Sequence, residues 1–464
     1  MRKDLYHEYS CYRDKMEEFI SMNNLLQKFS YTRIIAFSFL FVILLGSVLL
    51  SLPISTADGV WTPFLDSLFT ATSATCVTGL SIYDTGTYWS LFGQIVILCM
   101  IQIGGLGFMT IISMVSIFTK RKISLTERKL LMQSAGNMRI SGIVRLMKNI
   151  IFATLCFELA GSVLLAIRFL PRYGISYGLY YSVFHSVSAF CNAGFDLIGR
   201  GNSLRAYEGD WLVNITLMML IVCGGIGFLV WDELAKKKWH FSEYTLHAKL
   251  VLITSAILLV FGTLGFFCFE YNGNLSGYPL SKKILSSCFM SVTTRTAGFF
   301  TMDMATLSQS SCLLAMLLMF IGGSPGSTAG GIKTTTAAVV VLAVINLSKG
   351  RDDVTVFKKR LHDAVFKQAA VIILVYLLGI LFAGMIMCAI EPHSLTSIIF
   401  EIVSATGTAG LSQGITASLC TVSKLIIIIL MYGGRIGGLS LLMVFRERKK
   451  EARLRRPVEK ILIG

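Results

Sequence analysis

Charged residues and prolines are scarce in this chain of 464 residues. Only 15% of the residues are charged and seven are proline, whereas 54% are hydrophobic. Soluble domains carry about 25% charged residues, so this composition excludes an ordinary soluble enzyme or binding domain. It also excludes an intrinsically disordered chain, which has too few apolar residues to form a core. The apolar residues form blocks long enough to cross about 30 Å of hydrocarbon, which predicts an all-α membrane protein with several spans.

Several familiar motifs are also missing. The chain opens with about thirty mostly polar residues, so we expect no cleavable signal peptide. Its eleven cysteines are scattered and show no zinc-ligand spacing, so we expect buried, reduced thiols. No phosphate-binding loop appears, and His185 has no partner base or carboxylate at a useful spacing. Neither ATP-driven pumping by this chain nor an intramembrane enzyme is therefore favoured, and we expect no covalent cofactor.

The net charge of +16 is distributed unevenly. Five segments hold 32 of the 42 basic residues: the tail up to Arg33, 119–148, 232–250, 348–368 and 446–464. Cytoplasmic loops of membrane proteins are rich in Lys and Arg, so we expect both termini and these loops in the cytoplasm. Insertion in the cell membrane explains the charge, and no nucleic-acid partner is needed.

Eight apolar runs are long enough to span a membrane, an even number that agrees with both termini on one side. They are 33–53, 88–118, 149–170, 211–231, 247–269, 309–346, 368–390 and 422–445. A shorter apolar stretch follows each odd-numbered span: 62–74, 178–189, 281–293 and 394–405. At about twelve residues these stretches cannot cross a bilayer, which predicts re-entrant segments.

The short stretches repeat one another. Aligned on their last glycine they read FTATSATCVTG, FHSVSAFCNAG, CFMSVTTRTAG and FEIVSATGTAG, ending at Gly79, Gly194, Gly298 and Gly410. A Gly-Gly pair follows each copy: 104–105, 224–225, 322–323 and 433–434. Small residues recur in close-packed membrane helices generally, but two landmarks in register over four copies favour a true repeat. Four parallel repeats predict a pseudo-fourfold axis.

Helix, re-entrant loop and helix, repeated four times, is the plan of a cation pore. Each short helix would aim the negative end of its dipole at the axis, and backbone carbonyls would replace the hydration shell of potassium. The predicted filter positions are Val77, Thr78, Gly79, Asn192, Ala193, Gly194, Thr296, Ala297, Gly298, Thr408, Ala409 and Gly410. Their side chains differ, as expected if the backbone binds the ion.

None of the four segments contains a carboxylate, as expected for a nearly neutral filter, but charged residues lie in or near them. Arg295 lies inside the third segment, and we expect it to point behind the filter and brace the loop. The flanking carboxylates form either a negative outer vestibule, which would concentrate cations, or ordinary solvated loops. These carboxylates are Asp66, Asp84, Asp196, Asp303 and Glu401.

The third repeat contains GGSPGSTAGGIKTTT at residues 322–336, inside a run that is otherwise long enough to span. Glycine, proline and hydroxyl residues at this density interrupt a helix. The sequence predicts a broken helix whose loop obstructs the pore below a separate filter, although a kink without function would have the same composition. The predicted gate residues are Gly326, Ser327, Thr328, Gly330, Gly331, Lys333 and Arg435. Lys333 and Arg435 are intramembrane cations, which are usually functional.

These motifs resemble the Trk/Ktr/HKT superfamily of potassium transporters. The likeness rests on the four filter loops, on GGSPGSTAGGIKTTT and on the Gly-Gly-Arg-Ile-Gly of the last span, and it covers residues 33 to 445. Eight spans and short tails resemble the bacterial KtrB branch. The resemblance implies potassium uptake, with sodium stimulation in some members, by a homodimer that binds a cytosolic ring of nucleotide-binding regulatory subunits. Glycine rather than serine at position 79 implies a preference for potassium.

The sequence predicts that the chain is divided into six parts. They are an N-terminal tail (1–32), repeat one (33–118), repeat two (149–231), repeat three (247–346, with the gate loop), repeat four (368–445) and a basic tail (446–464). A sodium-selective or sodium-coupled secondary transporter remains an alternative, although such transporters commonly have inverted repeats. The basic face predicts a platform for the regulatory ring, or binding to anionic lipid.

Overall fold

The computed structural model describes residues 31–107, 143–198, 203–238, 240–350, 353–357 and 359–437. Apart from positions 31 and 32, the predicted tails lie outside the described residues, as does most of the basic segment 119–148. Within the described residues the regular elements are helices, apart from one antiparallel pair of two-residue strands in which Thr355 lies opposite Arg360.

The long helices are α2 (Tyr31–Ser51), α5 (Leu91–Leu106), α8 (Ile143–Phe190), α9 (Trp211–Ile226), α11 (Leu246–Glu270), α13 (Gln309–Phe320), α14 (Thr334–Ser348), α15 (Asp363–Ile390) and α17 (Thr421–Ile436). The shorter helices are α3 (Phe64–Thr75), α10 (Phe228–Lys237), α12 (Leu280–Thr293), α16 (Leu395–Gly407) and the single turn α4 (Thr85–Tyr88). Four short 3₁₀ helices are labelled η1 (Pro53–Ser55), η2 (Arg205–Tyr207), η3 (Phe241–Glu243) and η4 (Thr416–Ser418). The two strands are β1 (Thr355–Val356) and β2 (Lys359–Arg360).

Four of the described helices are long and apolar enough to cross a membrane: α2, α8, α11 and α15. Each is followed by one of the predicted short helices, which are α3, the second arm of α8, α12 and α16. We call the structure of each predicted repeat a unit. The second helix of each unit has only 12 to 16 residues; these helices are α5, α9, α13 and α17. The helices α5 and α17 end at residues 106 and 436, and the rest of the predicted runs 88–118 and 422–445, from residues 108 and 438 on, lies outside the described residues.

The boundaries in the second unit differ from the sequence prediction. The runs 149–170 and 178–189 were expected as separate elements, but both lie in α8, whose two arms meet at non-helical Gly174 just after Pro171. The predicted span 211–231 ends at residue 226, because the chain turns by 98° between α9 and α10. Positive φ at Gly227 permits this turn. The predicted run 309–346 is broken into α13 and α14, as expected.

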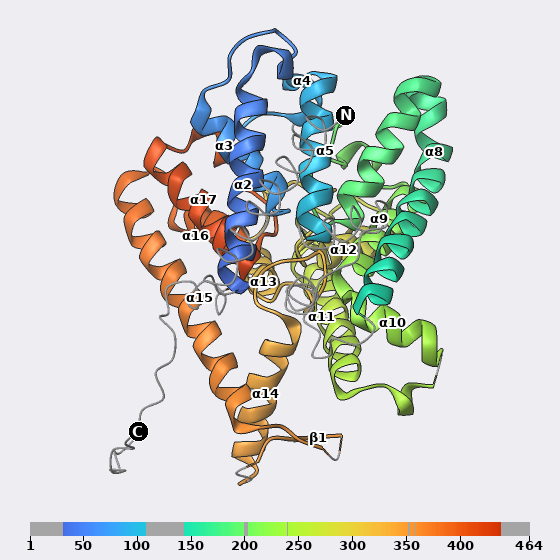
Figure 1. Ribbon diagram of the computed structural model, residues 1–464, viewed down its shortest axis with the longest axis vertical. Coiled ribbons are helices and arrows are strands. Elements are labelled where there is room, and N and C mark those ends of the chain that lie inside the picture. Colours follow the sequence, from blue (N-terminus) through green and yellow to red (C-terminus); the bar gives the residue numbers. More distant parts are fainter. Residues whose placement is uncertain are drawn as a thin grey trace, which may run out of the picture.

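The helices start where their sequences provide caps. Ser90, Asp210, Thr245, Ser308 and Ser394 accept a hydrogen bond from a backbone N–H in the first turn of α5, α9, α11, α13 and α16. Proline precedes α3 and α12. The short helices α3, α12 and α16 each pack on the long helix before them. Figure 1 shows α14 and α15 side by side, extending beyond the other helices.

Aromatic residues anchor the short helices in the core. Phe69, Phe184 and Phe400 stand ten residues before the repeat glycine, and their side chains are fully buried. In the third unit the buried aromatic residue is Phe289, one position later. Each unit therefore buries a phenylalanine at nearly the same position of its short helix.

Ion pairs join some neighbouring units. Lys424, at the start of α17, lies 2.8 Å from Asp66 on α3, and Tyr83 donates a hydrogen bond to the other carboxylate oxygen of Asp66. Lys282 on α12 pairs with Glu208, beside η2. The Lys424 and Asp66 side chains are only 14% and 11% exposed, so this pair is shielded from water.

We expect Lys424→Met to lower stability by about 3 kcal/mol, because it leaves a buried carboxylate without its cation. The melting temperature of the purified protein in detergent measures the effect. Adding Asp66→Asn should restore part of the loss. The matched control is Lys236→Met, whose pair with Asp232 is 65% exposed at the lysine and should contribute less than about 0.5 kcal/mol. Equal effects of the two lysine substitutions would contradict the assignment.

Candidate functional site

The four repeat glycines meet in a closed ring. A β-carbon at Gly79 would lie 2.7 Å from the carbonyl oxygen of Ala193, and one at Gly194 would lie 2.7 Å from that of Ala297. The same relation links Gly298 to Ala409 at 3.2 Å and Gly410 to Thr78 at 2.1 Å, which closes the cycle. Each glycine is thus faced by the carbonyl that precedes the glycine of the next segment. The sequence predicted this set of residues, and the fold brings all four segments together.

Each segment has the same unusual backbone. The residue two places before each glycine has positive φ: Val77 (58°), Asn192 (60°), Thr296 (66°) and Thr408 (52°). Left-handed backbone is uncommon outside glycine and is an outlier for β-branched residues such as valine and threonine. Such strain costs about 1–3 kcal/mol per residue and is typical of functional sites. The four glycines also have positive φ, between 71° and 96°.

Hydrogen bonds to the short helices hold this strained backbone. The amides of Thr78, Ala193 and Ala409 donate to the carbonyls of Ser73, Ser188 and Ser404, each five residues earlier. Hydroxyls add a second connection, since Ser73 accepts from the Gly79 amide and Ser188 donates to the Phe195 carbonyl. The Ser/Thr-rich sequence of the short helices therefore fastens each segment to its own helix.

Polar atoms at the segments are left without partners. Among the described residues, the hydroxyls of Thr75, Thr78, Thr296 and Thr408 are buried and make no hydrogen bond. Buried polar groups are normally satisfied, and an exception indicates a functional role or an ion or water at the site.

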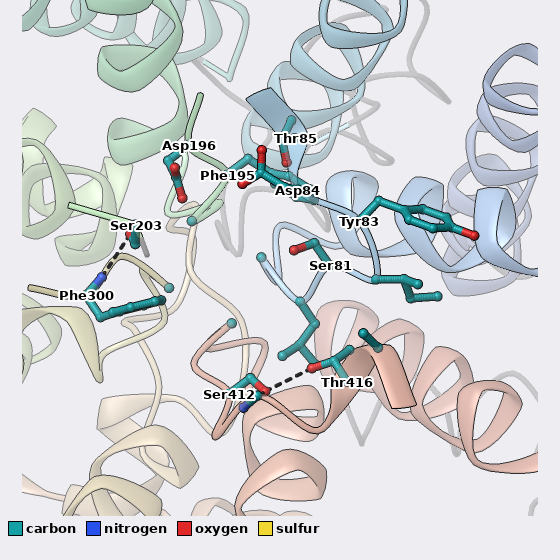
Figure 2. A pocket seen from close by; sticks show the side chains of 18 residues that line it. Ser81, Tyr83, Asp84, Thr85, Phe195, Asp196, Ser203, Phe300, Ser412 and Thr416 are labelled. Carbon is teal, nitrogen blue, oxygen red and sulfur yellow. Dashed lines mark hydrogen bonds between the residues drawn. The ribbon is translucent and has the colours of Figure 1, made fainter. Parts of the chain in front are cut away.

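A cavity of about 330 Å³ opens on one side of the ring, and all four glycines line it. Figure 2 shows that its labelled side chains come from all four units, among them Asp84, Asp196, Ser203, Phe300 and Ser412. Of the five flanking carboxylates, Asp84 and Asp196 line this cavity. Asp66 pairs with Lys424, Asp303 pairs with Arg205, and Glu401 is fully buried and accepts a hydrogen bond from Thr416.

The Gly-Gly pairs have a role that their sequence did not reveal. A β-carbon at Gly104, Gly224 or Gly434 would lie 1.9, 1.9 or 2.2 Å from the carbonyl oxygen of Thr75, Phe190 or Thr406. Those carbonyls stand four residues before the repeat glycines. The second helices of three units therefore contact the filter backbone directly, which only glycine permits. A further glycine three residues on has positive φ in every unit: Gly107, Gly227, Gly326 and Gly437. This recurrence is visible in the sequence, but the sequence prediction missed it.

In the third unit the predicted loop takes the place of that contact. A bridge between Ile321 and Ile332 closes its two ends. The Ser324 and Thr328 amides donate to the carbonyls of Gly225 and Gly224, and the Gly326 carbonyl accepts from Phe228. The loop thus sits on the bend between α9 and α10. Ser324, Thr328 and Thr334 are fully buried.

Both intramembrane cations bind the loop. Arg435 donates to the carbonyls of Thr328, Gly104 and Gly105. Lys333 donates to the Ala329 carbonyl at 2.8 Å. The loop, predicted to lie below the filter, touches the second predicted filter segment. The Thr328 hydroxyl lies 3.1 Å from the Phe190 carbonyl and 3.0 Å from Asn192 Oδ1.

Arg295 points away from the ring, as expected. Its guanidinium donates to the hydroxyl and, at 3.5 Å, to the carbonyl of Ser255 on α11. His185 is fully buried, with Nδ1 2.7 Å from the Tyr181 carbonyl, so its contacts are structural.

All ten described cysteines are free, as expected. They are not all buried, because Cys99, Cys156, Cys268 and Cys388 are exposed on the helix surfaces.

The chain matches the TrkH family of cation transport proteins over residues 32–454. It is 37% identical to the potassium/sodium uptake protein NtpJ of Enterococcus hirae, covering 94% of this chain and 98% of that protein. It is 38% identical to the Ktr system potassium uptake protein B of Bacillus subtilis, covering 94% and 97%. The corresponding protein of Vibrio alginolyticus is 36% identical, over 93% and 94%.

The fold is similar to the crystal structure of the potassium transporter TrkH from Vibrio parahaemolyticus. The TM-score is 0.69 at 18% identity, and the match covers 88% of this chain and 84% of that one.

We expect Gly224→Ala to destabilise the protein by about 3 kcal/mol, the upper end for overpacking a rigid site. The added carbon would lie 1.9 Å from the Phe190 carbonyl, which is backbone and cannot swing away. Gly379→Ala in α15 is the matched control, because nothing lies within 4 Å of its added carbon. Thermal unfolding in detergent compares the two. A Gly224 variant as stable as the Gly379 variant would refute the close contact.

Proposed function

Because the chain belongs to the TrkH family of cation transport proteins, we propose that it is the potassium-translocating membrane subunit of a Ktr-type uptake system. It is a multi-pass membrane transporter and not an enzyme. Potassium is its cargo. The ring formed by Gly79, Gly194, Gly298 and Gly410 is the observation that carries this proposal.

The ring suits a dehydrated monovalent cation. Four carbonyls, from Thr78, Ala193, Ala297 and Ala409, lie at one level where the segments touch. Carbonyl dipoles replace the water shell of potassium without a fixed negative charge. The segments 75–79, 190–194, 294–298 and 406–410 contain no carboxylate, so a bound ion is not held too tightly to leave. The remaining predicted filter residues shape this backbone.

Helix dipoles add to the attraction. The helices α3, α8, α12 and α16 end directly before the four segments. The C-terminal end of a helix carries a partial negative charge of about half an elementary charge. Four such ends around one axis favour a cation there. Asp84 and Asp196 in the adjoining cavity make the entrance negative.

The proposed architecture is four parallel repeats around this axis, with eight spans and four re-entrant short helices. The proposed boundaries of the repeats are those predicted from the sequence. The similar backbone of the four segments supports it. In this arrangement the cavity faces outward, and both termini and the basic loops face the cytoplasm.

The loop between α13 and α14 is the proposed gate, formed by Gly326, Ser327, Thr328, Gly330 and Gly331. A β-carbon at Gly330 would lie 2.1 Å from Thr408 Oγ1, so the loop sits directly against the fourth segment. Lys333 and Arg435 fix it through adjacent carbonyls and place positive charge next to the proposed ion path. The loop then obstructs the path both sterically and electrostatically.

A homodimer that binds a cytosolic ring of nucleotide-binding regulatory subunits is the proposed assembly. Lys236, Lys237, Lys249, Lys359 and Arg360 lie on described parts of the basic face. Anionic membrane lipids are the alternative partner of the same charges.

Sodium transport is the second candidate function, because the similar protein NtpJ of Enterococcus hirae is a potassium/sodium uptake protein. Rubidium and sodium fluxes into liposomes that hold the purified chain decide between the two. Rubidium uptake that exceeds sodium uptake supports the potassium subunit. Uptake of sodium alone, or uptake that strictly requires a sodium gradient, would support a sodium-selective or sodium-coupled transporter.

We expect Gly79→Ser to lower the rubidium-to-sodium flux ratio about tenfold, the factor that corresponds to 1.4 kcal/mol. Position 79 has a φ of 96°, and a β-carbon there would push against the Ala193 carbonyl, so the ring must distort. Gly277→Ser is the matched control, because its φ is also positive but nothing lies within 4 Å. An unchanged ratio in the Gly79 variant would contradict the assigned filter register.

Deleting Gly326 to Gly331 should raise rubidium flux about tenfold, because removing an obstacle worth 1.4 kcal/mol changes a rate by that factor. It should also weaken dependence on any regulatory subunit. Arg435→Met should act in the same direction but less strongly, since Lys333 still holds the loop. Fluxes are compared at equal amounts of inserted protein. If the deletion leaves both flux and regulator dependence unchanged, the loop is structural and the gate lies elsewhere.

A further inference from the structure

Thr328 connects the loop to three different elements. Its amide donates to the Gly224 carbonyl at the end of α9. Its carbonyl accepts from Arg435 on α17. Its hydroxyl reaches the second filter segment, at the Phe190 carbonyl and Asn192 Oδ1. The side chain is fully buried, so water does not compete for these bonds.

Asn192 continues this connection into the ring. It is the left-handed residue of its segment, with a φ of 60°, and its side chain is fully buried. While Oδ1 faces Thr328, the amide nitrogen Nδ2 faces the carbonyl of Arg295 in the third segment, at 3.5 Å. One amide therefore touches the loop on one side and a neighbouring filter segment on the other.

We propose that Asn192 is a specificity-determining positioning residue, which makes the ion preference of the filter depend on whether the loop is seated. This inference rests on the proposed function of the ring as a potassium filter. Asn192 Oδ1 and the Phe190 carbonyl share the single hydroxyl hydrogen of Thr328, and both lose this contact when the loop leaves. The amide must then reorient, and the strained backbone at residues 192 and 295 adjusts with it.

The loop also contacts the opposite side of the ring. Gly330 packs on Thr408, while Thr328 binds the second segment. In the cycle of contacts the second and fourth segments are not neighbours, so the seated loop spans the ring and sets the separation of two opposing segments. A carbonyl ring discriminates between cations by this geometry and by the number of its dipoles.

The test removes the hydroxyl of Thr328 without changing its shape. Thr328→Val should lower the rubidium-to-sodium flux ratio about fivefold, the factor that one neutral hydrogen bond of about 1 kcal/mol is worth. Thr328→Ser retains the hydroxyl and should keep the original ratio. Ser327→Ala is the matched control, because the Ser327 hydroxyl donates to Ser324 within the loop and not to the filter. Its ratio should be unchanged whatever its flux.

The deletion of Gly326 to Gly331 provides a second variant that removes the same contact. It should show a ratio as low as that of Thr328→Val. A wild-type ratio in either variant, with measurable rubidium flux, overturns the coupling but leaves the potassium filter and the gate standing. Absence of rubidium preference in the unmodified chain overturns the proposed function instead. A ratio that falls equally in Ser327→Ala would show a general effect of the loop and would also overturn the role of Asn192.

Discussion

The close approach of four backbones at one level is the constraint on which the rest of the structure depends. At each repeat glycine an added β-carbon would meet a carbonyl oxygen of the next segment within 2.1 to 3.2 Å, so no side chain fits there. Four backbones that pack this closely must be held in place by their surroundings. The structure supplies that restraint through the short helices, whose Ser/Thr-rich sequences bond the segments, and through buried aromatic residues such as Phe69 and Phe184 that fix the helices in the core.

The third unit differs from the other three in the position of its loop and in the anchor provided by Arg295. In units one, two and four a glycine of the second helix contacts the carbonyl four residues before the ring. In unit three that space holds the loop, and a β-carbon at Gly323 would instead meet Ala329 and Ser327 of the loop itself. The glycines of the third Gly-Gly pair therefore pack on the loop. Arg295 provides another anchor, since its buried guanidinium donates to Ser255 on α11. The guanidinium of Arg295 therefore braces the third segment from α11.

Much of the site could be predicted from the sequence because the segment that ends in glycine recurs in four repeats. The repeated glycines predicted which segments meet in the ring. The density of glycine and hydroxyl residues in one span predicted the break between α13 and α14. Local patterns could not reveal which pieces touch. Pro171 and Gly174 suggest a break, yet the two arms of α8 continue through them without a separate loop, because the chain resumes helix directly after one non-helical residue. The contact between the loop and the second segment was not predicted either. A contact between Thr328 and Asn192, 136 residues apart, depends on tertiary packing that no local pattern encodes.

The position of Lys333 gives the proposed gate a mechanical connection to the far end of α14. Lys333 is the residue that precedes this helix, and its ammonium group holds the Ala329 carbonyl. The helix α14 continues from there to Ser348 and packs along α15. A helix transmits displacement along its axis because its internal hydrogen bonds resist stretching. A force on residues 346–350 would therefore withdraw Lys333 and the loop together, whereas Arg435 belongs to another helix and would stay. The bond between Arg435 and the Thr328 carbonyl must then break. So must the contact of the Thr328 hydroxyl with the second segment and the backbone bonds that join the loop to the bend between α9 and α10.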